Sequence, residues 1–358
     1  MHLKVDLCQA LKRFTLVFSL CVTIGIGAAS AATLTRAEVI PYLSAQRLVD
    51  VGGHKINLYC TGHGSPSVIL DAGQAETTFA WRKVQPAIAK VTRVCSFDRA
   101  GMGFSEPGPL PRDAKGMVAD LHALLRNAHI GPPYVLVGHS IAGLYALLYA
   151  DRFLPEVAGM VLVDPSFPNQ TKTLQAASPT MKRMEADGPR ADTFCYNAAI
   201  HGRLSLQHGS QAYAICGFPP HAADDLRSAC AKNGAPWCEL EKLTRAQYTR
   251  PSFWAAYRSE DLASHTLDSA EDEKEQRNYG ATPLTVLTAA NDVGDSPIPP
   301  AEMRAINAAW KAGHDRLARL SSVGVNQVVQ RSEHDIALDR PMVVTAAVTS
   351  IVHRARRP

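Results

Sequence analysis

The stretch of sequence that decides the fold is YVLVGHSIAGLYALLYA, residues 134–150. An apolar run enters the pentapeptide GHSIA, and a helical pattern begins immediately after it. In a strand-to-helix turn of this kind the serine sits on a strained backbone with its hydroxyl exposed. The residues two before and two after it must be small, or the two backbones collide. Gly138 and Ala142 meet that requirement, so the stretch predicts a nucleophile elbow with Ser140 as the nucleophile.

Short apolar runs lie on both sides of this elbow and alternate with helical patterns. SVILDAG and RVCSFDRAG precede it, and GMVLVD and PLTVLTA follow it. Runs of this length and composition are typical of buried strands in a mostly parallel sheet. Between two of them, residues 115–128 place Met117, Leu121, Leu124 and Leu125 on one helical face. The alternation predicts an α/β fold built from βαβ units.

Two breaks in this pattern suggest how the chain is organised. Gly52-Gly53, between AQRLVDV and KINLYC, predicts an opening hairpin, because glycine supplies the positive φ of a tight turn. Between residues 165 and 282 the strand pattern stops, over a length that is too great for a simple loop. We expect a mainly helical insertion there. The predicted parts are a leader over 1–31, a first core part over 32–164, the insertion over 165–282 and a second core part over 283–358.

The leader has the composition of an export signal. Lys4, Lys12 and Arg13 precede the apolar run FTLVFSLCVTIGIGAA, and Ala29-Ser30-Ala31 gives the small-x-small pattern of a cleavage site. The run has about 16 residues, fewer than the roughly 20 that a membrane-spanning helix needs. We expect cleavage near Ala31 and a periplasmic or secreted mature chain that does not insert into a membrane.

Charge and composition exclude other classes of protein. The chain has 37 Lys+Arg against 33 Asp+Glu, with 46% hydrophobic and 20% charged residues, as in an ordinary globular protein. Without the leader the balance is 34 basic against 32 acidic residues. The one basic patch is the C-terminal HRARRP, which we interpret as a solvated tail, so the sequence argues against a nucleic-acid partner.

The number and spacing of the cysteines predict disulfide bonds. The leader carries Cys8 and Cys21, and six cysteines remain, an even number that predicts disulfide bonds in an oxidising compartment. We expect Cys60 to pair with Cys95, because both lie apart in sequence from the other four. Those four, which we expect to pair among themselves, are Cys195, Cys216, Cys230 and Cys238. Zinc is the competing interpretation, but no CxxC-like pair occurs and we expect no metal.

A serine nucleophile needs a base to take its proton and a carboxylate to orient that base. At an elbow of this kind the three follow the chain order Ser, Asp or Glu, His. The segment VNQVVQRSEHDIALDRP places His334 in a polar loop after the last predicted strand, which is the position of the base. His314 lies in a helical pattern and His353 in the tail, and we interpret both as surface histidines.

Two strand ends could supply the acid. PLTVLTAANDVGD puts Asp292, our preferred candidate, in the turn after one strand, with Asp295 three residues further on. GMVLVDP ends an earlier strand on Asp164, which is the alternative. Both Asp292 and Asp164 fall between Ser140 and His334, so chain order does not decide between them.

The oxyanion of the transition state requires backbone N–H donors. One is expected on the residue after the nucleophile and the other on the loop after an early strand. The first is Ile141. In SVILDAGQAE the second is Gln74, because Gly73 allows the chain to turn close to the substrate.

Five segments together resemble the α/β-hydrolase family of esterases, lipases and related hydrolases. They are LYCTGHGSPSVILDAG, VCSFDRAGMGFSEPGP, YVLVGHSIAG, GMVLVDPS and SEHDIALDRP. The resemblance implies that the DRxGxGxS stretch, residues 98–105, shapes a loop under the active site in a structural role. It also implies that the insertion forms a cap over that site. Dehalogenases and epoxide hydrolases of this fold carry aspartate at the elbow, and Ser140 argues against both.

This resemblance implies a serine hydrolase that cleaves a small-molecule carboxylic ester through an acyl-enzyme, without a cofactor. An amidase or aminopeptidase with the same triad is the alternative, and a catalytically silent binding protein is a third possibility. Aromatic residues of the insertion either line an acyl or aryl pocket or form the small core of the cap. These residues are Phe194, Tyr196, Phe218, Trp237, Phe253, Trp254 and Tyr257.

Overall fold

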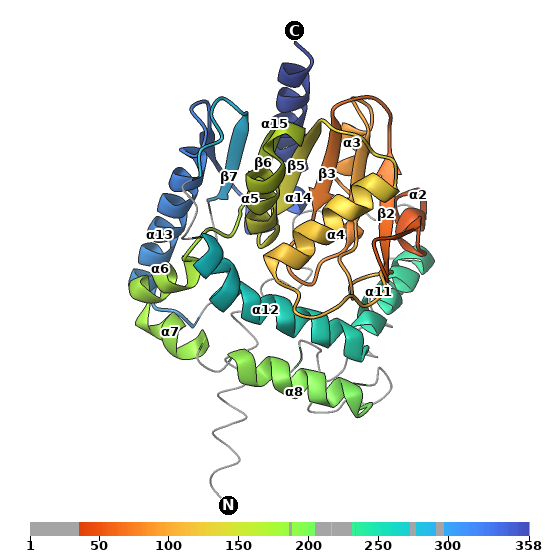
Figure 1. Cartoon of the computed structure of the whole chain (residues 1–358). Helices are drawn as coiled ribbons and strands as arrows, with labels where there is room; N and C mark the ends of the chain where they lie inside the picture. Colours follow the sequence, from red (N-terminus) through yellow and green to blue (C-terminus); the bar gives the residue numbers. More distant parts are fainter. Residues whose placement is uncertain are drawn as a thin grey trace, which may run out of the picture.

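An eight-stranded sheet forms the centre of the molecule (Figure 1). The structure is a computed structural model, and it describes residues 36–185, 188–204, 216, 231–232, 234–272, 277–290 and 297–357. The strands are β1 (Leu48–Asp50), β2 (Lys55–Thr61), β3 (Ser67–Asp71), β4 (Val94–Phe97), β5 (Tyr134–His139), β6 (Val157–Val163), β7 (Leu284–Ala289) and β8 (Val325–Val329). Their spatial order is β1-β2-β4-β3-β5-β6-β7-β8, and the pairs β1–β2 and β2–β4 are antiparallel while the others are parallel. The predicted α/β-hydrolase architecture is confirmed.

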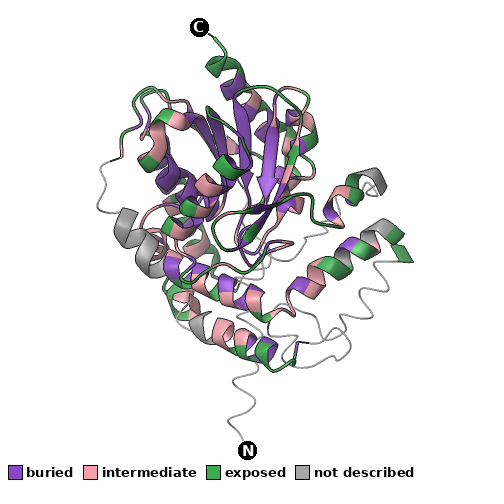
Figure 2. Cartoon of the chain, turned by 45° about the vertical axis from the view of Figure 1, so that its right-hand side comes forward, coloured by how far each residue is buried: buried purple, intermediate pink, exposed green. Residues whose placement is uncertain are grey.

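Helices cover both faces of the sheet, and the alternation of side chains along each strand supplies both cores. In β5, Leu136 packs on the face covered by α4 (Ala114–Asn127), α5 (Ala142–Phe153) and α13 (Pro300–Ala318). Its neighbours Val135 and Val137 pack on the opposite face, against α3 (Gln85–Ile88) and α15 (Pro341–Ala355). Buried strands run through the interior (Figure 2). The central strands are therefore apolar on both faces, which explains why they read as continuous apolar runs.

Short elements complete the core. They are α2 (Arg36–Val39), η2 (Ile40–Tyr42), η3 (Thr78–Trp81), η4 (Leu154–Glu156) and α14 (Ile336–Asp339). The predicted hairpin joins β1 to β2, and Gly52 and Gly53 have φ values of 107° and 105°. The Asp50 carboxylate accepts both of their N–H groups, at 2.7 and 3.3 Å. The glycine pair therefore forms the tight turn that the sequence predicted.

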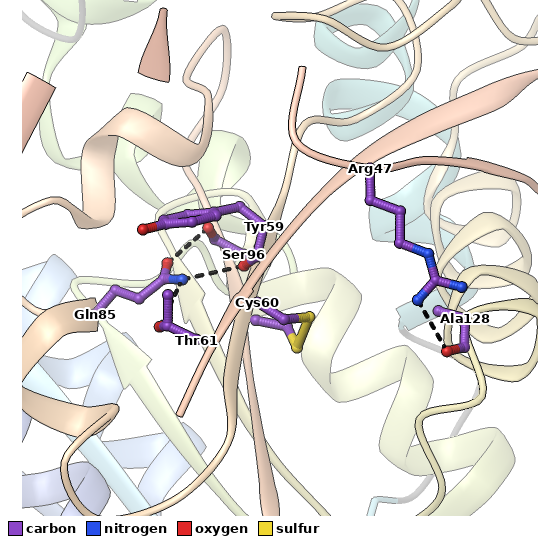
Figure 3. The surroundings of a disulfide bond; sticks show 8 residues. Arg47, Tyr59, Cys60, Thr61, Gln85, Ser96 and Ala128 are labelled. Carbon is purple, nitrogen blue, oxygen red and sulfur yellow. Dashed lines mark hydrogen bonds between the residues drawn. A yellow bond between two sulfur atoms is a disulfide. The ribbon is translucent and has the colours of Figure 1, made fainter. Parts of the chain in front are cut away.

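A disulfide bond links β2 to β4. Cys60 and Cys95 lie directly opposite each other in the antiparallel pair and are bonded, in the pairing expected from the sequence. Figure 3 shows Gln85 beside this bond, donating from Nε2 to the carbonyl of Tyr59 and accepting from the hydroxyl of Ser96. A second disulfide joins Cys195 to Cys216. Cys238 is also disulfide-bonded, and Cys230 lies outside the described residues.

The segment between β6 and β7, which we call the cap, is helical where it is described. Its helices are α6 (Gln170–Ala177), α7 (Pro179–Glu185), α8 (Gly188–Ile200), α11 (Ala235–Gln247) and α12 (Pro251–Asp272). In Figure 1, α12 and α8 are layered below the sheet. Phe253 and Trp254 are buried with residues of α8, and Tyr196 and Tyr257 pack against them. These aromatics form a core between α8 and α12, whereas Phe194 is exposed; Phe218 and the side chain of Trp237 lie outside the described part.

The predicted leader, residues 1–31, lies outside the described residues. Across the part of the chain that is described, none of the helices has the length and apolar character needed to cross a membrane.

Candidate active site

Three side chains meet at the carboxyl edge of the sheet, each after the end of a strand. Ser140 follows β5, Asp164 follows β6, and His334 lies in the loop after β8. Oγ of Ser140 lies 3.0 Å from Nε2 of His334, and Nδ1 of His334 lies 2.7 Å from Oδ2 of Asp164. A carboxylate only accepts hydrogen bonds, so Nδ1 carries the ring proton and Nε2 can accept from the serine hydroxyl. This is the geometry of a Ser-His-Asp triad.

The turn at Ser140 has the strained backbone of an elbow. Its φ of 55° lies in the left-handed region, which residues other than glycine rarely occupy. Its N–H donates to the carbonyl of Val163 (3.1 Å), and its own carbonyl accepts from the N–H of Gly143 (2.9 Å). A Cβ atom at Gly138 would overlap the carbonyl oxygen of Ala142. The small residue two before the serine is therefore a steric requirement.

Asp164 is a fully buried carboxylate with three donors around it. Besides His334, it accepts hydrogen bonds from the backbone N–H of Ala289 (2.9 Å) and from Nε1 of Trp310 (3.0 Å). Burial alone raises the pKa of Asp164, but the hydrogen bond from His334 and its charge outweigh burial, and the net effect is a lowered pKa. Asp164 is therefore ionised at neutral pH.

From the sequence we preferred Asp292 as the acid, with Asp164 as the alternative. Asp292 and Asp295 lie outside the described residues. Within the described part, the carboxylate that contacts Nδ1 of His334 is that of Asp164. Its only signal in the sequence is its place at the end of the run GMVLVD.

His314 is a second histidine near the site, and its interpretation as a surface residue is wrong. The side chain is fully buried. Its Nε2 donates to the carbonyl of Pro165 (2.8 Å), and its Nδ1 contacts the hydroxyl of Thr288 (2.7 Å). Burial lowers the pKa of His314, so the ring is neutral and joins the start of the cap to β7. His353 is exposed, as expected.

The two residues predicted to supply the oxyanion donors lie directly after Ser140 and in the loop after β3. Ile141 follows it directly and is the N-cap residue of α5, so its N–H lies at the helix N-terminus. Gln74 follows Gly73 after β3, and its side-chain Nε2 donates to Oδ1 of Asp261 in α12 (3.4 Å). A Cβ atom at Gly73 would lie 2.6 Å from a carboxylate oxygen of Glu76 and 2.9 Å from Nδ1 of His139, so a larger residue there would displace these two side chains.

A second histidine–carboxylate pair lies beside the triad, and the sequence did not predict it. Nδ1 of His139 lies 2.9 Å from Oε2 of Glu76, and Nε2 lies 3.1 Å from the carbonyl oxygen of His334. The same Glu76 oxygen accepts the N–H of Gly73 (2.6 Å). The pair therefore joins the loop after β3, the turn at Ser140 and the loop that carries His334. No sequence motif indicates this role for Glu76, because the residues that it joins are far apart in the chain and meet only in the folded structure.

Both ring nitrogens of His139 face oxygen atoms, which favours the protonated ring. Burial lowers the pKa of His139, but the charge of Glu76 and its hydrogen bond outweigh burial, and the pKa is raised. Oδ1 of Asp335 lies 3.8 Å from Nε2. Glu76, His139 and Asp335 lie close enough together to hold a cation. An imidazolium between the two carboxylates already fits this arrangement, so we assign no metal to it.

Residues 66–292 match the family model described as alpha/beta hydrolase fold. The chain belongs to this family. Among curated relatives, it is 29% identical over 128 residues to the uncharacterized protein YbdG of Bacillus subtilis, a match that spans 35% of this chain and 39% of that protein. It is 33% identical over 120 residues to the 2-hydroxy-6-oxo-2,4-heptadienoate hydrolase of Pseudomonas putida, spanning 33% of this chain and 43% of the relative. The chain thus spans less than half the length of each of these relatives.

Solved structures of hydrolases share the fold over most of the chain. A putative epoxide hydrolase from Pseudomonas aeruginosa superposes with a TM-score of 0.59 at 17% identity, covering 87% of this chain and 95% of that one. The enol-lactonase from Burkholderia xenovorans gives a TM-score of 0.54 at 16% identity, covering 86% and 100%. A thermophilic esterase from Thermogutta terrifontis gives 0.55 at 18%, covering 87% and 99%.

Proposed function

We propose that this α/β-hydrolase is a serine hydrolase that cleaves carboxylic esters through an acyl-enzyme. The observation that carries the proposal is the unbroken chain of contacts from Ser140 through His334 to Asp164, at 3.0 and 2.7 Å. Epoxide hydrolases resemble the chain in fold alone. The serine at the elbow favours acyl transfer, since a serine activated by a histidine is the nucleophile of that reaction.

In the proposed mechanism Oγ of Ser140 attacks the ester carbonyl while Nε2 of His334 takes the serine proton. Asp164 stabilises the imidazolium that forms and keeps Nδ1–H in place. His334 then returns the proton to the leaving alcohol. Water attacks the acyl-enzyme in a second step with His334 again as the base, which restores the free serine.

We assign the role of the acid to Asp164 in place of Asp292. Asp164 is fully buried, and its lowered pKa keeps it charged where the imidazolium forms. The oxyanion is assigned to the N–H groups of Ile141 and Gln74. Removal of a single donor of this kind typically costs about 10²- to 10³-fold in rate.

Export of the mature chain is also part of the proposal. The leader pattern over residues 1–31 supports it, and so do the disulfides Cys60–Cys95 and Cys195–Cys216, which persist in oxidising compartments.

The test is hydrolysis of a panel of p-nitrophenyl esters of increasing acyl length, beside matched p-nitroanilides. We expect the wild-type chain to cleave esters, Ser140→Ala to lose turnover, and the exposed-site control Ser322→Ala to keep it. Ester turnover by Ser140→Ala would overturn the proposal. Faster cleavage of the anilides than of the esters would replace the esterase assignment with the amidase alternative.

A further inference from the structure

Arg99, in the DRAGMGFS segment, is a buried cation without a place in the mechanism so far. It lies just after β4, with 3% of its surface exposed. Its Nη1 donates to the carbonyl of Ala72 (2.5 Å), and its Nη2 donates to the carbonyl of Gly73 (2.7 Å). Nη1 also donates to Oδ1 of Asp71 (2.8 Å). The guanidinium thus binds three successive residues that lead directly to Gln74.

These contacts determine where the N–H of Gln74 points. The carbonyl of Gly73 and the N–H of Gln74 belong to one peptide unit, which is planar and, when trans, has the two groups on opposite sides. With the Gly73 oxygen bound to Arg99, the Gln74 N–H points away from the guanidinium. A guanidinium is suited to this task, because its donors form a rigid planar fork. The ammonium group of lysine is a single point and could not hold two successive carbonyls and a carboxylate in the same way.

The cap holds Arg99 from the other side. Nε of Arg99 lies 2.9 Å from Oε1 of Glu260, a fully buried residue of α12. The same oxygen accepts a hydrogen bond from Tyr145 (2.9 Å), which belongs to the helix that starts at the elbow. The next residue of α12, Asp261, accepts from the side chain of Gln74 (3.4 Å). Helix α12 therefore contacts the loop of residues 72–74, which we call the oxyanion loop, directly through Asp261, and it reaches the same loop indirectly through Glu260 and Arg99.

Arg99 and the carboxylates around it are charged. Burial alone lowers the pKa of Arg99, but the charges of Glu260 and Asp71 outweigh it and raise the pKa, so the guanidinium stays charged. Burial raises the pKa of Asp71 to about 6, partly offset by Arg99. Asp71 is thus predominantly ionised at neutral pH, and Arg99 faces carboxylates from both the sheet and the cap.

We propose that Arg99 is a positioning residue for catalysis, through which Glu260 of the cap helix sets the direction of the Gln74 oxyanion donor. The inference rests on the proposed serine-hydrolase function. It gives the DRAGMGFS segment a role in transition-state binding beyond a structural one. It also gives the cap a role in positioning the Gln74 N–H, in addition to covering the site.

The test compares Arg99→Lys and Glu260→Gln with Arg277→Lys. The control changes another buried arginine, whose Nε lies 2.8 Å from Oδ2 of Asp151, away from the oxyanion loop. For each variant kcat and KM are measured on a p-nitrophenyl ester, together with the inhibition constant of an arylboronic acid, which forms a tetrahedral adduct on serine. Circular dichroism gives the folded fraction used to correct kcat.

We expect Arg99→Lys to lower kcat by about 10- to 100-fold, with KM within about threefold of wild type, since the donor is misdirected but not removed. The boronate inhibition constant should rise in proportion to the loss of kcat/KM. Glu260→Gln should show a smaller loss of the same kind, and Arg277→Lys should keep its kcat. If Arg99→Lys does not fold, Glu260→Gln carries the test.

The inference is overturned if the folded Arg99 and Glu260 variants keep the kcat of Arg277→Lys, or if kcat falls while boronate affinity is unchanged. A wild-type chain that is folded but cleaves no ester and binds no boronate would overturn the proposed function itself, and these two outcomes are distinct.

Discussion

The ring of His139 donates from Nε2 to the main-chain carbonyl of His334, 3.1 Å away, so the residue before Ser140 holds the loop that carries His334. Glu76 binds the other ring nitrogen at 2.9 Å. The proposed triad is therefore supported by a second histidine–carboxylate pair, which links the turn at Ser140 to the loop after β3 and to the loop that carries His334.

Replacing Glu76 by Gln should lower both activity and stability. The variant loses a charge-assisted hydrogen bond to His139, which is worth about 1.5–3 kcal/mol of unfolding free energy. We expect kcat to fall by about tenfold, because a shift of the base loop of that energetic order misplaces His334. Urea unfolding and steady-state kinetics measure the two effects, and a variant as stable and active as wild type would contradict the role given to the pair.

The same pair predicts how stability depends on pH. The pKa of His139 is raised by folding, so its contribution is complete below the unfolded value of about 6.5 and is lost as pH rises through the folded pKa. Burial raises the pKa of Glu76, but the charge of His139 and its hydrogen bond outweigh burial, and the pKa is lowered. The contribution of Glu76 to stability is therefore lost at acid pH, as the pH falls through its folded pKa. The difference in unfolding free energy between wild type and Glu76→Gln should be largest between about pH 4.5 and 6.5. A difference that grows steadily toward pH 9 would show that the ion pair is not its source.

Asp164→Asn should retain the fold and lose about 10³- to 10⁴-fold in kcat, because an amide at this position favours the wrong tautomer of His334. Asp292→Asn provides the comparison, since the two residues were the competing candidates for the acid. We expect this second variant to stay within about threefold of wild type, since the carboxylate of Asp164 already contacts Nδ1 of His334. The reverse ranking in steady-state kinetics would return the acid to Asp292.

Loss of the Cys60–Cys95 disulfide should destabilise the core without touching the site. The bond closes a loop with a sequence separation of 35 residues, for which the chain-entropy estimate is about 3–4 kcal/mol. We expect Cys60→Ala/Cys95→Ala to lose about that much unfolding free energy while kcat at low temperature is unchanged. Peptide mapping without reduction checks the pairing, and free thiols at both positions in the wild-type chain would contradict it.

The parts of the fold and site that could be predicted from the sequence are those specified by local pattern. Strands buried on both faces read as apolar runs, and the elbow requires small residues two positions before and two positions after Ser140. Asp164 was harder to assign, since the donors that hold it come from Ala289 and Trp310, far along the chain. The burial of His314 could not be predicted either, because helical periodicity does not show which element packs against a given face of the helix.

The measurement that tests the central claim most directly is covalent labelling with a fluorophosphonate, followed by mass spectrometry of the peptides. We predict a single adduct on the peptide that contains Ser140, formed together with loss of esterase activity and absent from Ser140→Ala. His334→Ala should be labelled far more slowly, because no base remains to take the serine proton. An adduct on another residue, or full loss of activity with Ser140 unmodified, would contradict the assignment of the nucleophile.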